Sequence, residues 1–244
     1  MRMSSYGSAL LVSAITRCAA VAGPSWVEPP CPGGDAGSNG SSAQSTTGSG
    51  PLGAIGGNLC GATNVAGSEG DFEDVFRIRI CNPKTFSART AANFNAQLWL
   101  FTDDGYGLLG NDDQGPSNLE AKIFAPADDG TAQGIPGPGV YLVAISGFNN
   151  DPLAVGDAIF DQGLTIERSG PDGPGGADVL DGWSAEGEIG EYVIHLEGAA
   201  LLGDDCSDPL HGVEVPAVSE WGVAILALTV LSGGTILLSR RGAW

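Results

Sequence analysis

Five side chains with oxygen ligands lie close together in the middle of the chain: Asp103, Asp104, Asn111, Asp112 and Asp113. Hard cations such as Ca²⁺ bind carboxylate, amide and backbone carbonyl oxygens, so this group is a candidate calcium site. The spacing does not match an EF-hand loop, because Asp103 and Asp104 are adjacent and the distal glutamate is missing. The alternative is that Asp and Asn next to glycine form tight turns here without a metal.

Residues for acid–base or nucleophilic catalysis are sparse. The chain has two histidines, His195 and His211, and lacks the H-E-x-x-H, G-x-S-x-G and Walker motifs. His195 alternates with Ile194 in a strand-like stretch and is expected to be exposed, whereas His211 lies in a proline-containing spacer. With 29 acidic residues, the choice of any one carboxylate pair as a glycosidase acid and base would be arbitrary. We therefore expect a protein that is not an enzyme and that has no cofactor other than the candidate Ca²⁺.

Composition and charge exclude several partners. The 244 residues include 10 Lys and Arg against 29 Asp and Glu, a net charge of −19. Such a surface repels phosphate backbones and anionic membranes, so no nucleic-acid partner is expected. The 39 glycines and 15 prolines disfavour a helical bundle.

The cysteines indicate disulfides. Cys18 belongs to the predicted signal peptide described below, which leaves Cys31, Cys60, Cys81 and Cys206, an even number without a C-x-x-C pair. Disulfides form in oxidising compartments, so the pattern favours an exported protein. Four cysteines can pair in three ways; we favour Cys60 with Cys81, closing a local loop, and Cys31 with Cys206, joining the ends of the folded region.

Alternating and continuous apolar stretches predict the fold. Phe76, Ile78 and Ile80 alternate with arginines, and residues 192–196 repeat this pattern, while 97–102 and 140–146 are continuously apolar, as buried central strands are. Asp, Pro and Gly clusters at 103–105, 128–130, 136–139 and 171–174 separate them. These features predict an all-β fold, an antiparallel β-sandwich over residues 58–203. A Gly/Ser-rich flexible segment at 23–57 precedes it, and a spacer at 204–214 follows.

The two ends carry targeting signals. Residues 1–22 contain Arg2, a short apolar stretch and the small-residue pattern Ala20-Val21-Ala22, which predict a cleaved signal peptide. Residues 223–238 form an uncharged apolar run between Trp221 and the pair Arg240 and Arg241. This predicts a single C-terminal transmembrane helix, and the positive-inside rule places the rest of the chain outside the cell.

The residues before that run resemble a known sorting signal. Val215, Pro216, Ser219, Glu220, Trp221 and Gly222, followed by the apolar run and by Arg240 and Arg241, resemble the IPTL-type C-terminal sorting domain. The resemblance implies a substrate of an exosortase-type membrane transpeptidase, which removes the helix and the basic tail. Residues 215–244 are therefore predicted to be a sorting signal.

The middle of the chain resembles the bacterial pre-peptidase C-terminal domain. The similarity lies in four segments in order, 70–78, 94–101, 107–113 and 139–147. That family is a β-sandwich of jelly-roll type and usually accompanies a catalytic domain, for which this chain leaves no room.

These features predict a non-catalytic exported protein of the cell surface or extracellular matrix, with the secretion machinery and the transpeptidase as partners. A membrane-anchored precursor would give a mature form at the cell surface or outside the cell. The alternative is a carbohydrate- or calcium-binding surface module of lectin-like type. For binding an envelope polysaccharide, exposed aromatics such as Trp183 or Tyr106 would be expected to line a groove.

Overall fold

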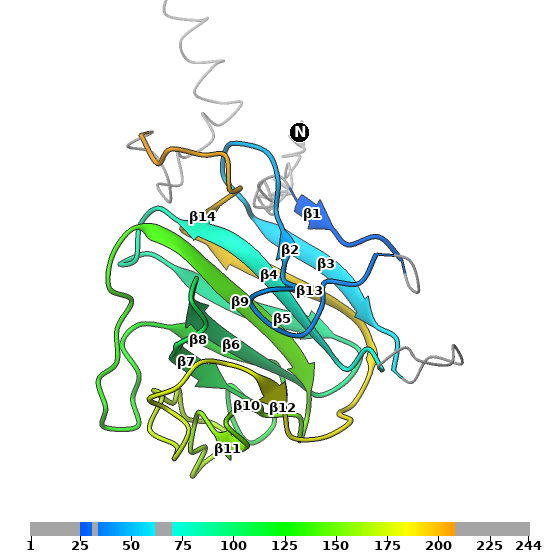
Figure 1. Cartoon of the computed structure of the whole chain (residues 1–244), viewed down its shortest axis with the longest axis vertical. Helices are drawn as coiled ribbons and strands as arrows, with labels where there is room; N and C mark the ends of the chain where they lie inside the picture. Colours follow the sequence, from blue (N-terminus) through cyan, green and yellow to red (C-terminus); the bar gives the residue numbers. More distant parts are fainter. Residues whose placement is uncertain (1–24, 31–33, 62–69, 208–244) are drawn as a thin grey trace, which may run out of the picture.

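The computed structural model describes residues 25–30, 34–61 and 70–207 (Figure 1). These residues form strands and connections without any α-helix, which confirms the predicted all-β fold. Among them, no helix is long and apolar enough to span a membrane. The predicted signal peptide, Cys31, His211, the predicted transmembrane helix and the sorting residues at 215–241 lie outside the described residues.

One five-stranded sheet, here called sheet A, contains strands from both ends of the domain. Its order is β1 (Ser25–Val27), β3 (Ala54–Leu59), β13 (Gly190–Glu197), β5 (Ser87–Ala92) and β8 (Lys122–Phe124). Neighbouring strands are antiparallel except β1 and β3, which run parallel. As the alternating pattern predicted, Tyr192, Ile194 and Leu196 of β13 point into the core. The residues between them face outward.

The second sheet, sheet B, contains the most apolar strands. Its order is β14 (Ala199–Ala200), β4 (Glu73–Ile80), β9 (Gly139–Gly147), β6 (Ala96–Thr102) and β7 (Gly107–Asn111), and β2 (Gln44–Ser45) pairs parallel with β4. The strands β6 and β9, predicted as buried central strands, are adjacent and buried on both faces. Sheet B therefore needs cover on both sides.

Two apolar clusters provide this cover. The larger one lies between the sheets and joins Phe76, Leu98 and Val143 of sheet B to Ile55 and Ile194 of sheet A. The smaller one lies on the other face of sheet B, between that face and residues 150–183. This segment contains a small sheet of β11 (Asp157–Ala158), β10 (Pro152–Ala154) and β12 (Gly182–Trp183).

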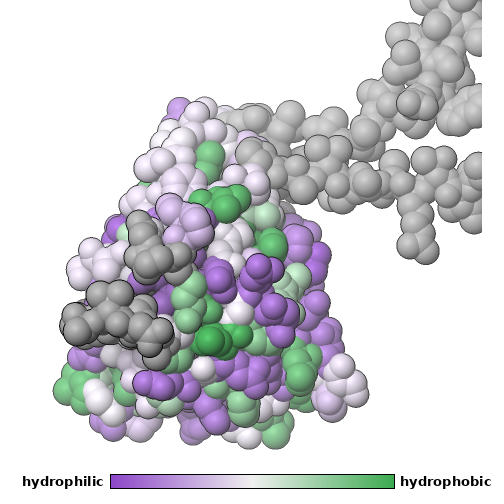
Figure 2. All heavy atoms as spheres, turned by 90° about the vertical axis from the view of Figure 1, so that its right-hand side faces the viewer, coloured by the Kyte–Doolittle hydropathy of each residue, from purple (hydrophilic) through white to green (hydrophobic). Residues whose placement is uncertain are grey.

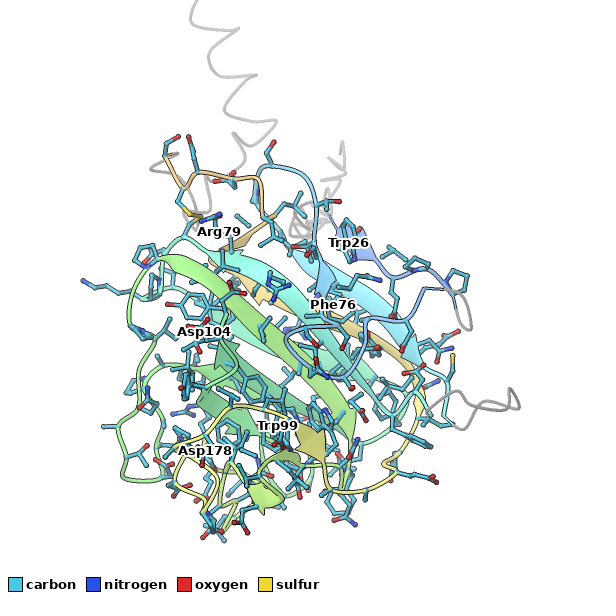
Figure 3. All side chains as sticks on the ribbon, viewed as in Figure 1. Trp26, Phe76, Arg79, Trp99, Asp104 and Asp178 are labelled. Carbon is cyan, nitrogen blue, oxygen red and sulfur yellow. A yellow bond between two sulfur atoms is a disulfide. The ribbon has the colours of Figure 1, made fainter. Side chains whose placement is uncertain are left out.

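Trp99 is the centre of the smaller cluster, on the side of β10 and β12 (Figure 3). Its ring centroid lies 5.2 Å from that of Phe160, and its Nε1 donates a hydrogen bond of 2.9 Å to Ser146 Oγ. An indole with a satisfied N–H can be fully buried, so the layer over sheet B is part of the fold. Among the described residues none provides comparable cover for sheet A, and its outward-facing residues are partly or fully exposed.

The N-terminal part differs from the prediction. Residues 23–57, predicted to be flexible, contain β1, β2 and most of β3, and they bury Ala36, Leu52 and Ile55. Trp26 Nε1 donates 2.7 Å to Gln44 Oε1, which ties β1 to β2. The sandwich therefore begins well before residue 58, and the parallel pairs of β1 and β2 make its sheets mixed where antiparallel sheets were predicted.

The disulfide pairing also differs. Cys81 is bonded to Cys206, with Cα atoms 5.2 Å apart, so the favoured pairs Cys60–Cys81 and Cys31–Cys206 are wrong. The reason is that β14 pairs antiparallel with the end of β4, and a turn at Leu201–Asp204 then directs the chain back to Cys81. Cys60 is disulfide-bonded as well.

Removing the Cys81–Cys206 bridge is expected to destabilise the domain without changing its fold. The bridge joins residues 125 apart in sequence, and cross-linking a loop of this length restricts the unfolded chain strongly. The double variant Cys81→Ala/Cys206→Ala should lose on the order of 3–5 kcal/mol of unfolding free energy. Urea denaturation followed by circular dichroism measures this. The surface variant Ser207→Ala is the control, and equal urea midpoints for all three proteins would contradict the expectation.

Candidate cation-binding site

The structure separates the residues of the predicted calcium site. Asp103 and Asp104 lie in the connection between β6 and β7, and Arg77 Nε forms an ion pair of 2.6 Å with Asp103 Oδ1.

Asn111, Asp112 and Asp113 lie at the other end of β7. Asn111 has a structural role: its Nδ2 donates to the carbonyl oxygens of Asp113 and Glu167 at 2.9 and 2.8 Å, and its Oδ1 accepts from Lys122 N at 2.7 Å. Since the length of β7, roughly 15 Å, lies between the two groups, the five residues do not form one site. Burial, followed by the nearby charges of Asp113, Asp151 and Glu188, raises the pKa of Asp112 to about 7.

Another group of acids, here called the acidic cluster, converges at one end of the core between the sheets. It consists of Glu28, Asp35, Asp71 and Asp74. One carboxylate oxygen from each of Glu28, Asp35 and Asp74 lies within 4.8 Å of the others. The side chain of Asp71 is hydrogen-bonded to that of Asp35. Four carboxyl groups from distant parts of the chain thus share one small volume.

The fold positions three of these residues, Glu28, Asp71 and Asp74, through their backbones. Glu28 directly follows β1, and its N–H donates 2.9 Å to Gly56 O on β3. Asp71 lies just before β4, where its backbone pairs with Gly61. Asp74 is on β4 in phase with Phe76, and so points into the core rather than to solvent.

Hydrogen bonds then orient the carboxylates. Glu28 Oε1 accepts from Ala36 N at 2.7 Å, and Asp71 Oδ2 accepts from Cys60 N at 2.7 Å. The Tyr192 hydroxyl on β13 donates 2.6 Å to Asp74 Oδ2, across the space between the sheets. Gly57 leaves room for this arrangement, because a Cβ there would clash with the Tyr192 hydroxyl and with Glu28 Oε2.

Burial and mutual repulsion dominate the electrostatics of the cluster. Burial raises the pKa of Glu28 to about 7, with smaller contributions from the charges of Asp71 and Asp35. Burial, helped by Asp35, raises the pKa of Asp71 to about 6. Burial, then the charges of Glu28, Asp71 and Asp35, raises the pKa of Asp74 well above its usual range. These acids are thus costly to ionise together without a compensating positive charge.

The residues of the cluster fit a hard divalent cation. All offer oxygen atoms, which Ca²⁺ prefers, and none offers the nitrogen or sulfur that zinc favours. Asp74 is fully buried, and within the part of the chain that the structure describes its Oδ1 has no hydrogen-bond partner. A second convergent group, Cys81, Asp204 and Cys206, is unsuitable because its sulfur atoms form the disulfide.

The other residues singled out in the sequence lie away from this cluster. His195 is on the outward face of β13 opposite Arg89 of β5, and burial together with the Arg89 charge lowers its pKa. Trp183 Nε1 donates 2.7 Å to Ser38 O, and its ring packs on the cluster around Trp99. Tyr106 is 47% exposed in the β6–β7 connection.

One signal in the sequence could have indicated the acidic cluster. Asp74 occupies an inward position of the strand in which Phe76, Ile78 and Ile80 point inward, so it breaks the apolar face of a clear alternating pattern. A buried acid in such a position needs a partner. Glu28 and Asp35 gave no such signal, because they lie in the stretch predicted to be flexible.

In buffer with a chelator, we expect the domain to lose stability as pH rises. Carboxyl groups with raised pKa bind protons more tightly in the folded chain, so their contribution is complete below the ordinary carboxyl pKa of about 4. It is lost as pH rises through the folded values of about 6 for Asp71 and about 7 for Glu28. Each such group changes the unfolding free energy by up to about 1.4 kcal/mol per pH unit in this window.

Urea denaturation between pH 4 and 8 measures this slope. Asp74→Asn should flatten it, because one buried titrating group is removed, whereas Asp104→Asn in the exposed turn should leave it unchanged. A stability that rises with pH in the wild-type chain would contradict the assignment.

Comparisons of the chain with protein-family models, with curated proteins and with solved structures find no match.

Proposed function

We propose that this chain is a non-catalytic, exported protein of the cell surface or extracellular matrix. Support for export comes from the predicted signal peptide and from the disulfide chemistry, since disulfides persist in oxidising compartments. Support for sorting comes from the motif of Pro216, Ser219, Glu220, Trp221 and Gly222. In this proposal the secretion machinery exports the chain, and an exosortase-type transpeptidase cleaves it at its C-terminal signal.

The same proposal assigns the folded part to a β-sandwich of jelly-roll type similar to the bacterial pre-peptidase C-terminal domain. The two sheets with a shared apolar core support a module of this kind. The predicted transmembrane helix would hold the precursor in the membrane until cleavage. The mature form then remains at the cell surface or leaves the cell.

We further propose that the domain binds a hard divalent cation, with Ca²⁺ as the best fit. One observation carries this proposal: oxygens of the buried Glu28 and Asp74 and of the exposed Asp35 converge within 4.8 Å of one another. A cation would offset their repulsion and take up the unpartnered Asp74 Oδ1. It would also join the segment after β1 to β4, and so fix the N-terminal part of the sandwich.

The proposed cleavage at the sorting signal predicts a mature protein that lacks its C-terminal tail. The full chain should be produced in a Gram-negative host with an exosortase-type transpeptidase, and its intact mass measured. We expect a mature N-terminus near Gly23 and loss of the residues after the motif. The Trp221→Ala variant should retain its tail. A wild-type chain that still ends at Trp244 would overturn the proposal.

Calcium should raise the melting temperature of the domain at neutral pH. At a free concentration of 100 times Kd, binding stabilises the folded state by about 2.7 kcal/mol, which corresponds to roughly 5–10 °C for a domain of this size. Calorimetric titration with Ca²⁺, together with thermal unfolding, measures both quantities. At pH 5 the effect should shrink, because protons compete for Glu28 and Asp71.

A matched pair of variants separates this site from the one suggested by the sequence. Asp74→Asn should abolish Ca²⁺ binding, whereas Asp112→Asn, which also neutralises a buried acid, should retain it. Loss of binding only in Asp112→Asn would place the cation at the end of β7. Absence of heat and of a thermal shift at millimolar Ca²⁺ would overturn the cation proposal and leave the sorting proposal intact.

A further inference from the structure

The outward face of sheet A carries two adjoining hollows. The first, of about 590 Å³, extends from Val27 of β1 across β3, β13 and β5 to Glu120. The second, of about 610 Å³, continues to Phe148 and Glu188. Both are lined by Ala92, Asn93 and Glu120, so they form one continuous depression, here called the sheet A groove.

Strand register explains the direction of the groove. Val27 pairs with Gly56, Gly56 with Val193, and Val193 with Ala91, so one row of small outward residues crosses four strands. Longer side chains border this row: Asn58 and Glu191 on one side, and the paired His195, Arg89 and Lys122 on the other. The groove therefore runs across the strands, and four neighbouring strands give it a length of roughly 15 Å.

The second hollow supplies apolar surface. Phe94, Phe148 and Leu119 line it, and Phe148 and Leu119 are 36% and 52% exposed. Asn95 and Glu188 lie beside them, and Asn95 N donates 2.8 Å to Glu188 Oε2.

The charges that line the sheet A groove limit the kind of ligand that it can bind. The linings contain the carboxylates of Glu28, Glu120, Glu188 and Glu191 and several amides, but no Lys or Arg. Such a lining repels polyanions and accepts hydrogen bonds, which suits a ligand with many hydroxyl donors. Arg89 and Lys122, which lie next to the groove, would repel a polycationic ligand.

The geometry also disfavours a peptide. A bound extended peptide usually adds to a sheet edge, where backbone groups are unpaired, but this groove crosses the paired interior of sheet A. On the side of the molecule where β1 and β3 lie in Figure 1, hydrophilic and hydrophobic residues intermingle rather than forming one large apolar patch (Figure 2). Large apolar patches are typical of protein–protein interfaces.

We propose that the sheet A groove binds an extended, uncharged polysaccharide. Its hydroxyl groups donate to Glu191, Glu120 and the neighbouring amides, and the apolar faces of its sugar rings pack on Phe94 and Phe148. The small residues at Gly56, Val193 and Ala91 let the chain lie close to the sheet. Glu28 lines the groove and also belongs to the acidic cluster, whereas the residues assigned to the glycan, such as Gly56 and Glu191, lie outside that cluster.

Affinity electrophoresis of the mature chain in gels with soluble polysaccharides tests this proposal. The gels contain neutral β-glucan, neutral mannan, chitosan as an amine-bearing polymer or alginate as a uronate polymer. We expect at least one neutral polysaccharide to retard the protein, and alginate to have no effect. Oligosaccharides of the retarding polymer then give Kd by calorimetric titration.

Two glycine variants give a matched comparison. A Cβ at Gly56 meets only Tyr192 O at 3.9 Å, an ordinary contact, so Gly56→Leu places a side chain on the groove floor without a clash. We expect it to weaken binding at least tenfold. Gly182→Leu in β12, where a Cβ also has open space, should bind as wild type does. Melting temperatures equal to that of the wild type show that both variants are folded.

Several outcomes would overturn the proposal. Retardation by alginate would indicate an anion site at Arg89 and Lys122, and retardation by chitosan alone would indicate a general polycation surface. Binding that Gly56→Leu leaves unchanged would place the glycan elsewhere on the protein. Absence of retardation by every neutral polymer would exclude the groove as a polysaccharide site, while the Ca²⁺ titration decides the cation proposal separately.

Discussion

The burial of both faces of sheet B is the constraint on which the rest of the structure depends. Its central strands β6 and β9 are apolar on each side, so a single covering layer would leave one face in water. Sheet A covers one face, and residues 150–183 with Phe160 and Trp183 cover the other. Since sheet A needs only one apolar face to do this, the described part of the chain leaves its other face open, and there the groove forms. The acidic cluster lies where the core between the sheets ends.

The acidic cluster illustrates how a fold can hold groups that repel one another. Glu28 and Asp71 accept hydrogen bonds from backbone N–H groups, and Asp74 accepts one from the Tyr192 hydroxyl, so these three carboxylates are oriented by neutral donors. Neutral donors reduce the cost of burying a charge but do not remove the repulsion between charges. The cluster is therefore left with two ways to reach a stable state, by binding protons or by binding a cation. Both use the same oxygens, so they compete.

The sequence predicts this structure best where contacts are local. The alternation around Phe76 and Ile194 and the apolar runs of β6 and β9 predict strands, because side-chain periodicity is decided within a few residues. The parallel pairing of β1 with β3 was missed, since its residues are rich in glycine and carry no periodic signal. The Cys81–Cys206 bond and the meeting of Glu28 with Asp74 depend on which strands become neighbours. That choice is made by the packing of whole sheets, which no local pattern contains.

The disulfide between Cys81 and Cys206 also determines how the domain would carry mechanical load. A pull on the chain beyond residue 207 reaches the end of β4 through a covalent bond, and bypasses β14 and everything between the two cysteines. The backbone of strands β5 to β14 lies inside this closed loop, so it is not itself stretched between the two cysteines. Force entering from the C-terminal side is thus borne by the hydrogen bonds of β4 to β9, the longest strand pairing in the domain, which is loaded along its length.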